Sequence, residues 1–212
     1  RQRAREMGWK LNEYGLCDAA DNALEPADEE SIFEHLELAW IPAELRGDLG
    51  EVERAEQLFE AGDPWPDLIE FEQIQGTLHC HSDWSDGRAS LLEMVQSAAD
   101  RGWKYYGTAD HSSAAAYASG LSIDQLHQQR VEIDQLRQQF PDLIILHGIE
   151  SDILSDGSLD YPDDVLAELD YVVASVHSNF SLAKQQQTDR IEKALRNPYT
   201  TVSGPPTGRL LL

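Results

Sequence analysis

Two histidines separated by a single residue, His79 and His81, are the first side chains in this sequence with the spacing of a metal site. Side chains of a β-strand alternate between its two faces, so on a strand both imidazoles project from one side and can bind one ion. Cys80 lies between them and then points the other way, where we expect it to fill the core. The turn residues 85–87 follow, and they place the Asp86 carboxylate just beyond the strand, within reach of a second cation.

Further side chains of the same chemical types follow three later apolar segments, each of which we expect to be a strand. In folds of alternating strands and helices, the carboxyl ends of the parallel strands share one rim, and active sites lie there. We therefore expect the following side chains to converge: His79, His81, Asp110, His111, Glu150 and His177. Mixed imidazole and carboxylate ligands suit Zn, Mn or Fe, and a bridging carboxylate such as Glu150 is what a multi-metal hydrolase requires.

The elements that must position these residues begin near Ile74, where short apolar stretches start to alternate with amphipathic ones. The last helix is expected to begin at Thr188 as its N-cap. Strands are predicted over 77–81, 105–109, 143–149, 171–176 and 200–203, and helices over 89–101, 123–140, 163–169 and 188–196. This order predicts an α/β fold with a parallel sheet or barrel.

The first part of the chain has a different character. A basic helical piece, a strand or hairpin and two helices are predicted over 1–7, 9–16, 28–36 and 51–59. The stretch 63–67 contains two prolines and breaks regular structure, so a domain boundary is expected there. We divide the chain into residues 1–70, a small α+β piece, and residues 71–212, the α/β domain.

Several residues allow more than one interpretation. Asp110, a candidate catalytic carboxylate together with Glu150, is expected either to bind a metal or to orient a ligand imidazole. His147 lies three residues before Glu150 on the same strand, so we expect it to face the other way and pack. Two arginines, Arg190 and Arg209, are candidates for contact with a substrate phosphate, against ordinary ion pairing. Three further carboxylates are predicted to belong to a solvated acidic loop because the spacing of a calcium loop is absent: Asp152, Asp156 and Asp160.

Composition narrows the function classes. The formal net charge is −23, which argues against a broad electrostatic grip on nucleic acid, so any polyanionic substrate must be held locally, as bound divalent metals can do. No apolar run is long enough to span a membrane, and the first residues lack the apolar core of a signal peptide. The two cysteines, Cys17 and Cys80, are far apart and suit a reducing compartment. These features favour a cytoplasmic protein.

Taken together, the motifs resemble those of the PHP (polymerase and histidinol phosphatase) superfamily. The matching segments are His79-Cys80-His81, Ser85-Asp86-Gly87, Asp110-His111, Gly148-Ile149-Glu150 and Ser175-Val176-His177-Ser178. The resemblance implies a distorted seven-stranded βα barrel, incomplete in this chain, with up to three divalent metals such as Mn²⁺ or Zn²⁺.

The same resemblance implies a set of metal ligands. His79, His81 and Glu150 would hold the first metal, Glu150 and His177 the second, and Asp86 with His111 the third. The family usually has Gly-His-Pro where this chain has Gly204-Pro205-Pro206, and proline has no coordinating side chain. The second metal would therefore lack one ligand.

The flanking segments resemble bacterial family X DNA polymerases that carry a C-terminal PHP domain. They include residues 11–16, 30–36, 42–46 and 204–211. The first 70 residues resemble the end of the palm and the thumb, so we expect an internal piece of a longer protein whose last barrel strands lie beyond Leu212. The parent is expected to be a hydrolase that trims DNA 3′ ends beside a repair polymerase.

Two other functions stay open at this point. One is a small-molecule phosphatase of the histidinol-phosphate type, against which the polymerase-like first 70 residues weigh. The other is a degenerate PHP domain with a structural role, which the proline at position 205 suggests. We also expect residues 1–212 alone to be poorly soluble or partly unfolded, and inactive, because an incomplete barrel exposes an edge strand and apolar surface.

Overall fold

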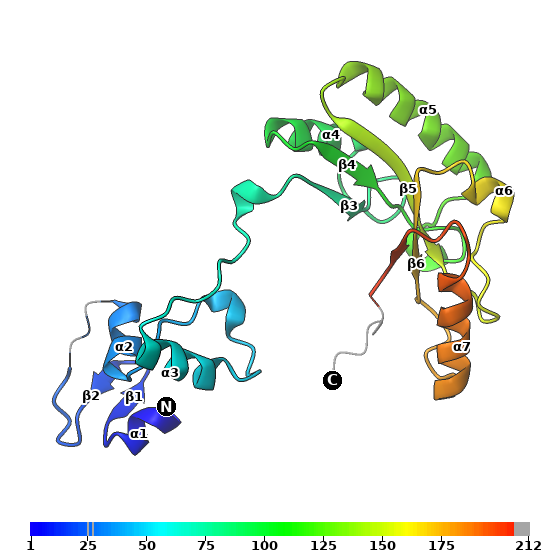
Figure 1. Cartoon of the computed structure of the whole chain (residues 1–212). Helices are drawn as coiled ribbons and strands as arrows, with labels where there is room; N and C mark the ends of the chain where they lie inside the picture. Colours follow the sequence, from blue (N-terminus) through cyan, green and yellow to red (C-terminus); the bar gives the residue numbers. More distant parts are fainter. Residues whose placement is uncertain (25, 27, 206–212) are drawn as a thin grey trace. The chain divides into compact units, whose positions relative to one another are not determined.

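The computed structural model describes residues 1–24, 26 and 28–205, and the chain divides into two compact units, Arg1–Ile69 and Glu70–Leu212 (Figure 1). The first unit consists of a β-hairpin with short helices. Its elements are α1 (Gln2–Glu6), β1 (Lys10–Asn12), β2 (Gly15–Cys17), α2 (Glu29–His35), the 3₁₀ turn Ala43–Leu45 and α3 (Glu51–Ala61).

Local sequence signals explain the elements of the first unit. The strands β1 and β2 pair antiparallel with Leu11 opposite Leu16, and Asp28 caps α2 by accepting a hydrogen bond from the Ser31 backbone N–H at 2.8 Å. A small core holds the unit together, formed by Ala4, Leu16, Leu36, Leu38, Ile41 and Ala55. This piece is α+β, as the sequence predicted.

The second unit is built around a five-stranded parallel sheet with the order β3-β4-β5-β6-β7. Its strands are β3 (Gly76–Cys80), β4 (Tyr105–Thr108), β5 (Ile144–Asp152), β6 (Tyr171–Ser175) and β7 (Val202–Ser203). The main helices are α4 (Leu91–Asp100), α5 (Ile123–Gln139), α6 (Asp163–Leu166) and α7 (Lys184–Leu195), with 3₁₀ turns at Phe71–Gln73 and Ala116–Ala118. The predicted α/β fold with a parallel, curled sheet is confirmed.

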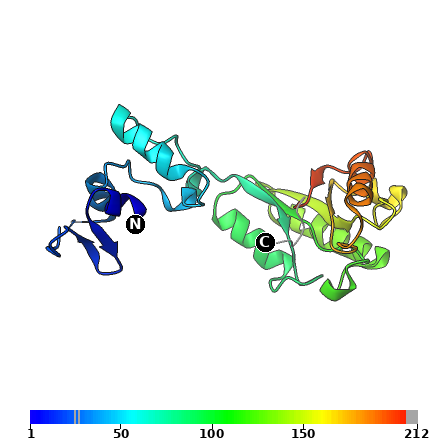
Figure 2. The same cartoon turned by 90° about the horizontal axis from the view of Figure 1, so that it is seen from below.

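The helices cover the outer side of this curled sheet (Figure 1), and the view from below shows α4 in green and α7 in orange at opposite ends of the unit (Figure 2). Apolar residues spaced along one face of α4 and α5 pack on the strands. One cluster includes Leu91, Val95, Tyr106, Ile133 and Ile145, and a second includes Leu126, Ile149, Val172 and Ala194. Burial of these faces is the main force that fixes the helices on the sheet.

Among the element boundaries that differ from the sequence predictions, two affect the interpretation of candidate residues. The strand β5 continues to Asp152 instead of ending at Ile149. The helix α7 begins at Lys184, so the prediction of Thr188 as an N-cap is wrong, and the Thr188 hydroxyl instead donates to the Lys184 carbonyl within the helix at 3.0 Å. A polar run of glutamines precedes Thr188, and such residues propagate a helix well although they give no apolar signal.

The largest side chain of the apolar cluster on the inner side of the sheet is Tyr171. Its hydroxyl lies 2.7 Å from the carbonyl oxygens of both Leu78 and Thr108, and it therefore links the start of β6 to β3 and β4. Glycines line the space that the ring occupies. A Cβ atom at Gly148 would lie 2.3 Å from the ring, and one at Gly107 would lie 2.5 Å from the hydroxyl oxygen.

The helices in the described part of the chain are short for a membrane span. Even α5, with 17 residues, lacks the length and the apolar character that a crossing needs.

This packing gives a first prediction. Replacement Gly148→Ala forces the new methyl group into the Tyr171 ring and should lower the free energy of unfolding by roughly 1–3 kcal/mol, the usual cost of overpacking. Thermal or urea unfolding monitored by circular dichroism measures the change. The control is Gly47→Ala, where a Cβ meets only the Leu49 side chain at 3.6 Å. Equal stability of the two variants would contradict the packing argument.

Candidate metal centre

Four successive strands deliver the predicted ligands to one rim. His79 lies on β3 and His81 directly follows it, His111 follows β4, Glu150 lies on β5 and His177 follows β6. Backbone hydrogen bonds set the two middle positions side by side. The Glu150 N–H donates to the Asp110 carbonyl at 2.9 Å, and the Ser112 N–H donates to the Glu150 carbonyl at 3.0 Å.

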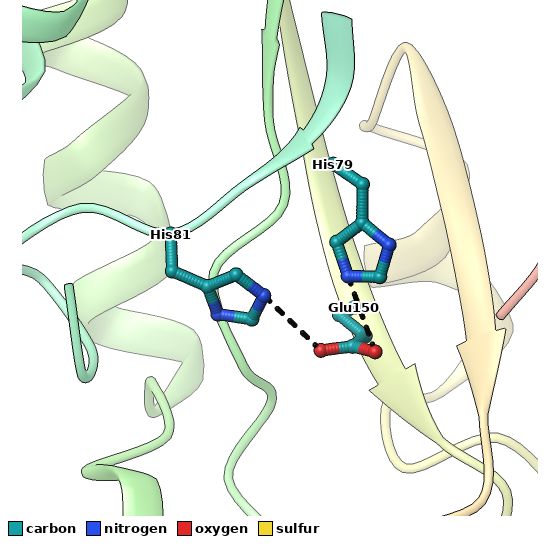
Figure 3. Close-up of side chains that lie close together, drawn as sticks. All are labelled: His79, His81 and Glu150. Carbon is teal, nitrogen blue, oxygen red and sulfur yellow. Dashed lines mark ion pairs between the residues drawn. The ribbon is translucent and has the colours of Figure 1, made fainter. Parts of the chain in front are cut away.

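The Glu150 carboxylate lies at the centre of the cluster and is only 3% exposed. Figure 3 shows His79, on β3, and His81, on the segment directly after it, pointing at this carboxylate. The Oε1 atom faces the Nε2 atoms of His79 at 3.2 Å and His177 at 3.3 Å, and Oε2 faces His81 Nε2 at 3.4 Å and His111 Nδ1 at 3.1 Å. Each carboxylate oxygen therefore meets two imidazoles, which is the geometry of a bridging ligand.

The charge state of Glu150 follows from these contacts. Burial alone would raise the pKa of the carboxyl group, but hydrogen bonds from His177 and His79 outweigh burial and hold the pKa well below its usual range. The group is therefore an anion. Burial lowers the pKa of His111, which leaves that imidazole neutral with a free lone pair, the form that binds metals.

Buried ring nitrogens show that the site fits metal ions. His81 Nδ1 and His111 Nδ1 are buried and make no hydrogen bond with any group in the described ranges. Their nearest carboxylate oxygens, on Asp86 at 3.3 Å and on Glu150 at 3.1 Å, are neighbours without hydrogen-bond geometry. Buried polar atoms are rarely left this way unless a ligand uses them.

The side chains form three overlapping groups in which the donor atoms lie within 4.8 Å of one another. These groups are His79, His81 and Glu150; His81, Asp86 and His111; and His111, Glu150 and His177. The imidazole nitrogen and carboxylate oxygen donors suit Zn, Mn or Fe. The pocket that holds most of them has a volume of ≈ 230 Å³ and is also lined by Pro205.

A further carboxylate, Asp152, belongs to this centre. It is 3% exposed, and its Oδ1 lies 2.7 Å from His177 Nδ1 while the opposite nitrogen of that ring faces Glu150. Hydrogen bonds to Asp152 and then to Glu150 raise the pKa of His177 to about 9. Carboxylates placed in this way orient ligand histidines and make them better donors.

The sequence prediction of a solvated loop is therefore wrong for Asp152. The expected strand ends at Ile149, whereas β5 continues to Asp152, and strand alternation then puts residues 150 and 152 on one face. Asp156 is on the surface as expected, where it accepts hydrogen bonds from Ser158. Asp160 is half-buried and accepts a hydrogen bond from the Ala114 N–H at 2.7 Å.

The other candidate residues lie away from the cluster. Asp110 is completely buried beneath the rim, and it is absent from all three groups of donor atoms among the described residues. His147 is 2% exposed and packs on the opposite face of β5 from Glu150.

The prediction that Arg190 contacts a substrate phosphate is not supported by its position. The side chain is 2% exposed, and its guanidinium donates to the backbone carbonyls of Ser178 and Ile153. Arg190 lies one helical turn before the buried Ala194, on the face of α7 that packs on the core. Arg209 lies outside the described residues.

Asp152 gives a second prediction. Replacement Asp152→Asn keeps the shape but removes the charge that supports His177, so the affinity for divalent metal should fall by roughly 10- to 100-fold. Calorimetric titration with Mn²⁺ or Zn²⁺ measures the metal affinity. Asp156→Asn, on the exposed loop that follows the same strand, is the matched control and should bind metal as the parent does. Equal affinities in both variants would remove Asp152 from the centre.

Family models match both parts of the chain. The PHP domain model matches residues 77–204, and the model of the DNA polymerase beta thumb matches residues 1–47. The PHP match covers the sheet except for Gly76, the first residue of β3, and it includes every side chain of the three donor groups.

Individual relatives agree with these matches. The chain is 41% identical over all 212 residues to the DNA polymerase/3′-5′ exonuclease PolX of Bacillus subtilis (strain 168), of which it covers 36%. A probable phosphatase of Clostridium acetobutylicum is 34% identical over 132 residues, which are 60% of this chain and 51% of the relative. A probable phosphatase of Clostridium botulinum is 28% identical over 118 residues, 54% of this chain and 46% of the relative. The chain thus spans about a third to a half of the length of these relatives. It belongs to the PHP domain family, in the form found in family X DNA polymerases, where a polymerase thumb precedes the PHP domain.

Proposed function

We propose that the second unit is a metal-dependent phosphoesterase that hydrolyses DNA 3′ ends in a family X DNA polymerase. The observation that carries this proposal is the buried Glu150 carboxylate with four imidazoles around it. When bound, divalent cations would withdraw electron density from the phosphoryl group and make water a stronger nucleophile at neutral pH. The thumb match and the exonuclease named in the relative from Bacillus subtilis support DNA as the substrate.

The residues of this chain have distinct parts in such a reaction. The three donor groups would hold up to three cations close together, with Glu150 shared between two groups. Asp152 keeps the His177 ring oriented through its Nδ1 atom, so the other nitrogen faces the centre. The net charge of −23 makes this local positive charge necessary for a polyanionic substrate. Mn²⁺ and Zn²⁺ are the ions we propose.

The function of a small-molecule phosphatase is the second candidate. Two probable phosphatases are similar to this chain over about half of its residues. Their similarity supports a small phosphomonoester as the substrate. Comparison of the specificity constant for a short oligonucleotide with that for glycerol phosphate distinguishes the two. We expect the oligonucleotide to be preferred by at least tenfold, and a preference for the small ester would favour the second candidate.

A third candidate is a degenerate domain that serves a structural role. Pro205 lines the pocket of the metal centre, and its ring offers no donor atom there. Elemental analysis of the full-length parent after dialysis against excess Mn²⁺ or Zn²⁺ tests this candidate. We expect two to three equivalents of metal per chain, whereas one or none would favour the structural role.

Hydrolysis itself gives the next prediction. In the full-length parent with Mn²⁺, His81→Ala should reduce release of nucleotides from 3′-labelled DNA by at least 100-fold, because His81 belongs to two of the three donor groups. The control is His127→Ala, an exposed histidine on α5 whose side chain faces Glu168. Excess EDTA should abolish release by the parent and the control. Undiminished release by His81→Ala would overturn the assignment of the centre.

A further inference from the structure

A buried carboxylate beneath the rim has contacts that the metal groups do not explain. Asp110 is 0% exposed and accepts five hydrogen bonds. The Ser82 N–H and the Ser85 hydroxyl donate to Oδ1 at 2.7 and 2.6 Å. The Ser82 hydroxyl, the Gln129 amide and the Thr108 hydroxyl donate to Oδ2 at 2.7, 2.7 and 3.0 Å. So many donors around one carboxylate define its position closely.

Three of these five donors, from Ser82 and Ser85, belong to the loop that carries the metal-binding candidate Asp86. The loop, residues 82–87, begins next to His81 and includes Asp86. Its backbone folds tightly around Ser82, since the N–H groups of Ser85 and Gly87 donate to the Ser82 carbonyl at 3.1 and 2.9 Å. A Cβ atom at Gly87 would lie 2.1 Å from the His81 carbonyl oxygen, so the turn leaves no room for a side chain there. The loop is therefore fixed through Ser82 and Ser85 to Asp110.

The amide of Gln129 connects this carboxylate to the strand of Glu150. Its Nε2 donates to Asp110, so its Oε1 is left to accept, and His147 Nε2 lies 3.0 Å from that oxygen. The imidazole must then carry its proton on Nε2. Burial lowers the pKa of His147 to about 4, in keeping with the neutral ring that this arrangement requires. The chain of contacts runs from the loop through Asp110 and Gln129 to β5.

The position of Asp86 depends on this support. Its side chain is 47% exposed, and its carboxylate oxygens lie 3.3 Å from His81 Nδ1 and 3.7 Å from His111 Nε2. Little packing holds so exposed a side chain, so the backbone of the loop must set its position relative to the two rings. Among the residues that the structure describes, Asp86 belongs to a single donor group, the one with His81 and His111.

We propose that Asp110 and Gln129 are positioning residues that hold loop 82–87 through Ser82 and Ser85, and so determine the affinity of the His81, Asp86 and His111 group for its cation. The proposal rests on the proposed metal-dependent function. Asp110 acts through the loop and does not touch the substrate or the metal. The other two donor groups contain no residue of the loop, so their affinities should be independent of it.

The test removes one hydroxyl group at a time. Ser85→Ala deletes a single donor to Asp110, Ser85→Thr restores it, and Asp86→Ala removes the ligand itself. The control is Ser90→Ala, at the end of the segment that connects β3 to α4. The Ser90 hydroxyl accepts a hydrogen bond from the Glu93 N–H and does not contact Asp110. Each variant of the full-length parent is titrated with Mn²⁺ alone by calorimetry, and its melting temperature is measured without metal.

The expected pattern is selective. Ser85→Ala should weaken one Mn²⁺ site by roughly 10- to 100-fold, the same site that Asp86→Ala removes, while the remaining sites keep the affinity of the parent. Ser85→Thr should recover that site, and Ser90→Ala should leave it unchanged. Gln129→Met, which deletes the amide inside the core, should show the same selective loss.

Three outcomes would overturn the proposal: no change in Ser85→Ala, an equal loss at every site, or no effect of Asp86→Ala on the Mn²⁺ titration. Hydrolysis of DNA is assayed separately on the parent. Selective loss of one metal site together with an inactive parent would reject the proposed exonuclease and retain the positioning role. An active parent, together with equal weakening of every Mn²⁺ site in Ser85→Ala, would reject the positioning role and retain the proposed exonuclease.

Discussion

The meeting of one carboxylate with four imidazoles is the interaction on which the rest of this structure depends. Glu150 can collect His79, His81, His111 and His177 only because the strands that carry them run parallel and end at the same level. An isolated bridge between His111 and Glu150 continues the pairing of these two segments to a position three residues beyond the end of β4 at Thr108. The spacing of the strands in the sheet therefore sets the spacing of the candidate ligands. The helices packed on the outer side support the curled form of the sheet.

The α/β fold and the convergence of the candidate ligands at one rim could be predicted from the sequence because both follow from local periodicity. His79 and His81 share a face by strand alternation, and Asp110-His111, Glu150 and His177 follow apolar runs that could only be strands of one sheet. The spacing of these residues relative to the apolar runs involves only a few neighbours along the chain. Their convergence at one rim therefore follows from the order of the strands, without any information on contacts between distant residues.

The roles of Asp152, Arg190 and Asp110 depend on distant contacts, and the sequence could not supply them. Asp152 looks like part of an acidic loop until β5 is seen to extend through it, and the partner that gives it a role, His177, lies 25 residues away. Arg190 looks exposed among glutamines, yet tertiary packing draws its guanidinium to backbone carbonyls. Asp110 stands beside a ligand in the sequence, but its five donors come from β4, α5 and the loop after β3.

The Tyr171 ring closes the inner side of the sheet below the metal centre. Tyr171 pairs with Gly148 and Val173 pairs with Glu150, so both inner side chains lie at or below the level of the carboxylate, and together with Ala109 they form an apolar layer. Hydrated ions and phosphate groups are strongly disfavoured in such a layer. In the proposed hydrolysis, cations, water and the leaving group would therefore arrive and depart on the side of the strand ends. Metal exchange and product release would then share one path, and each would obstruct the other.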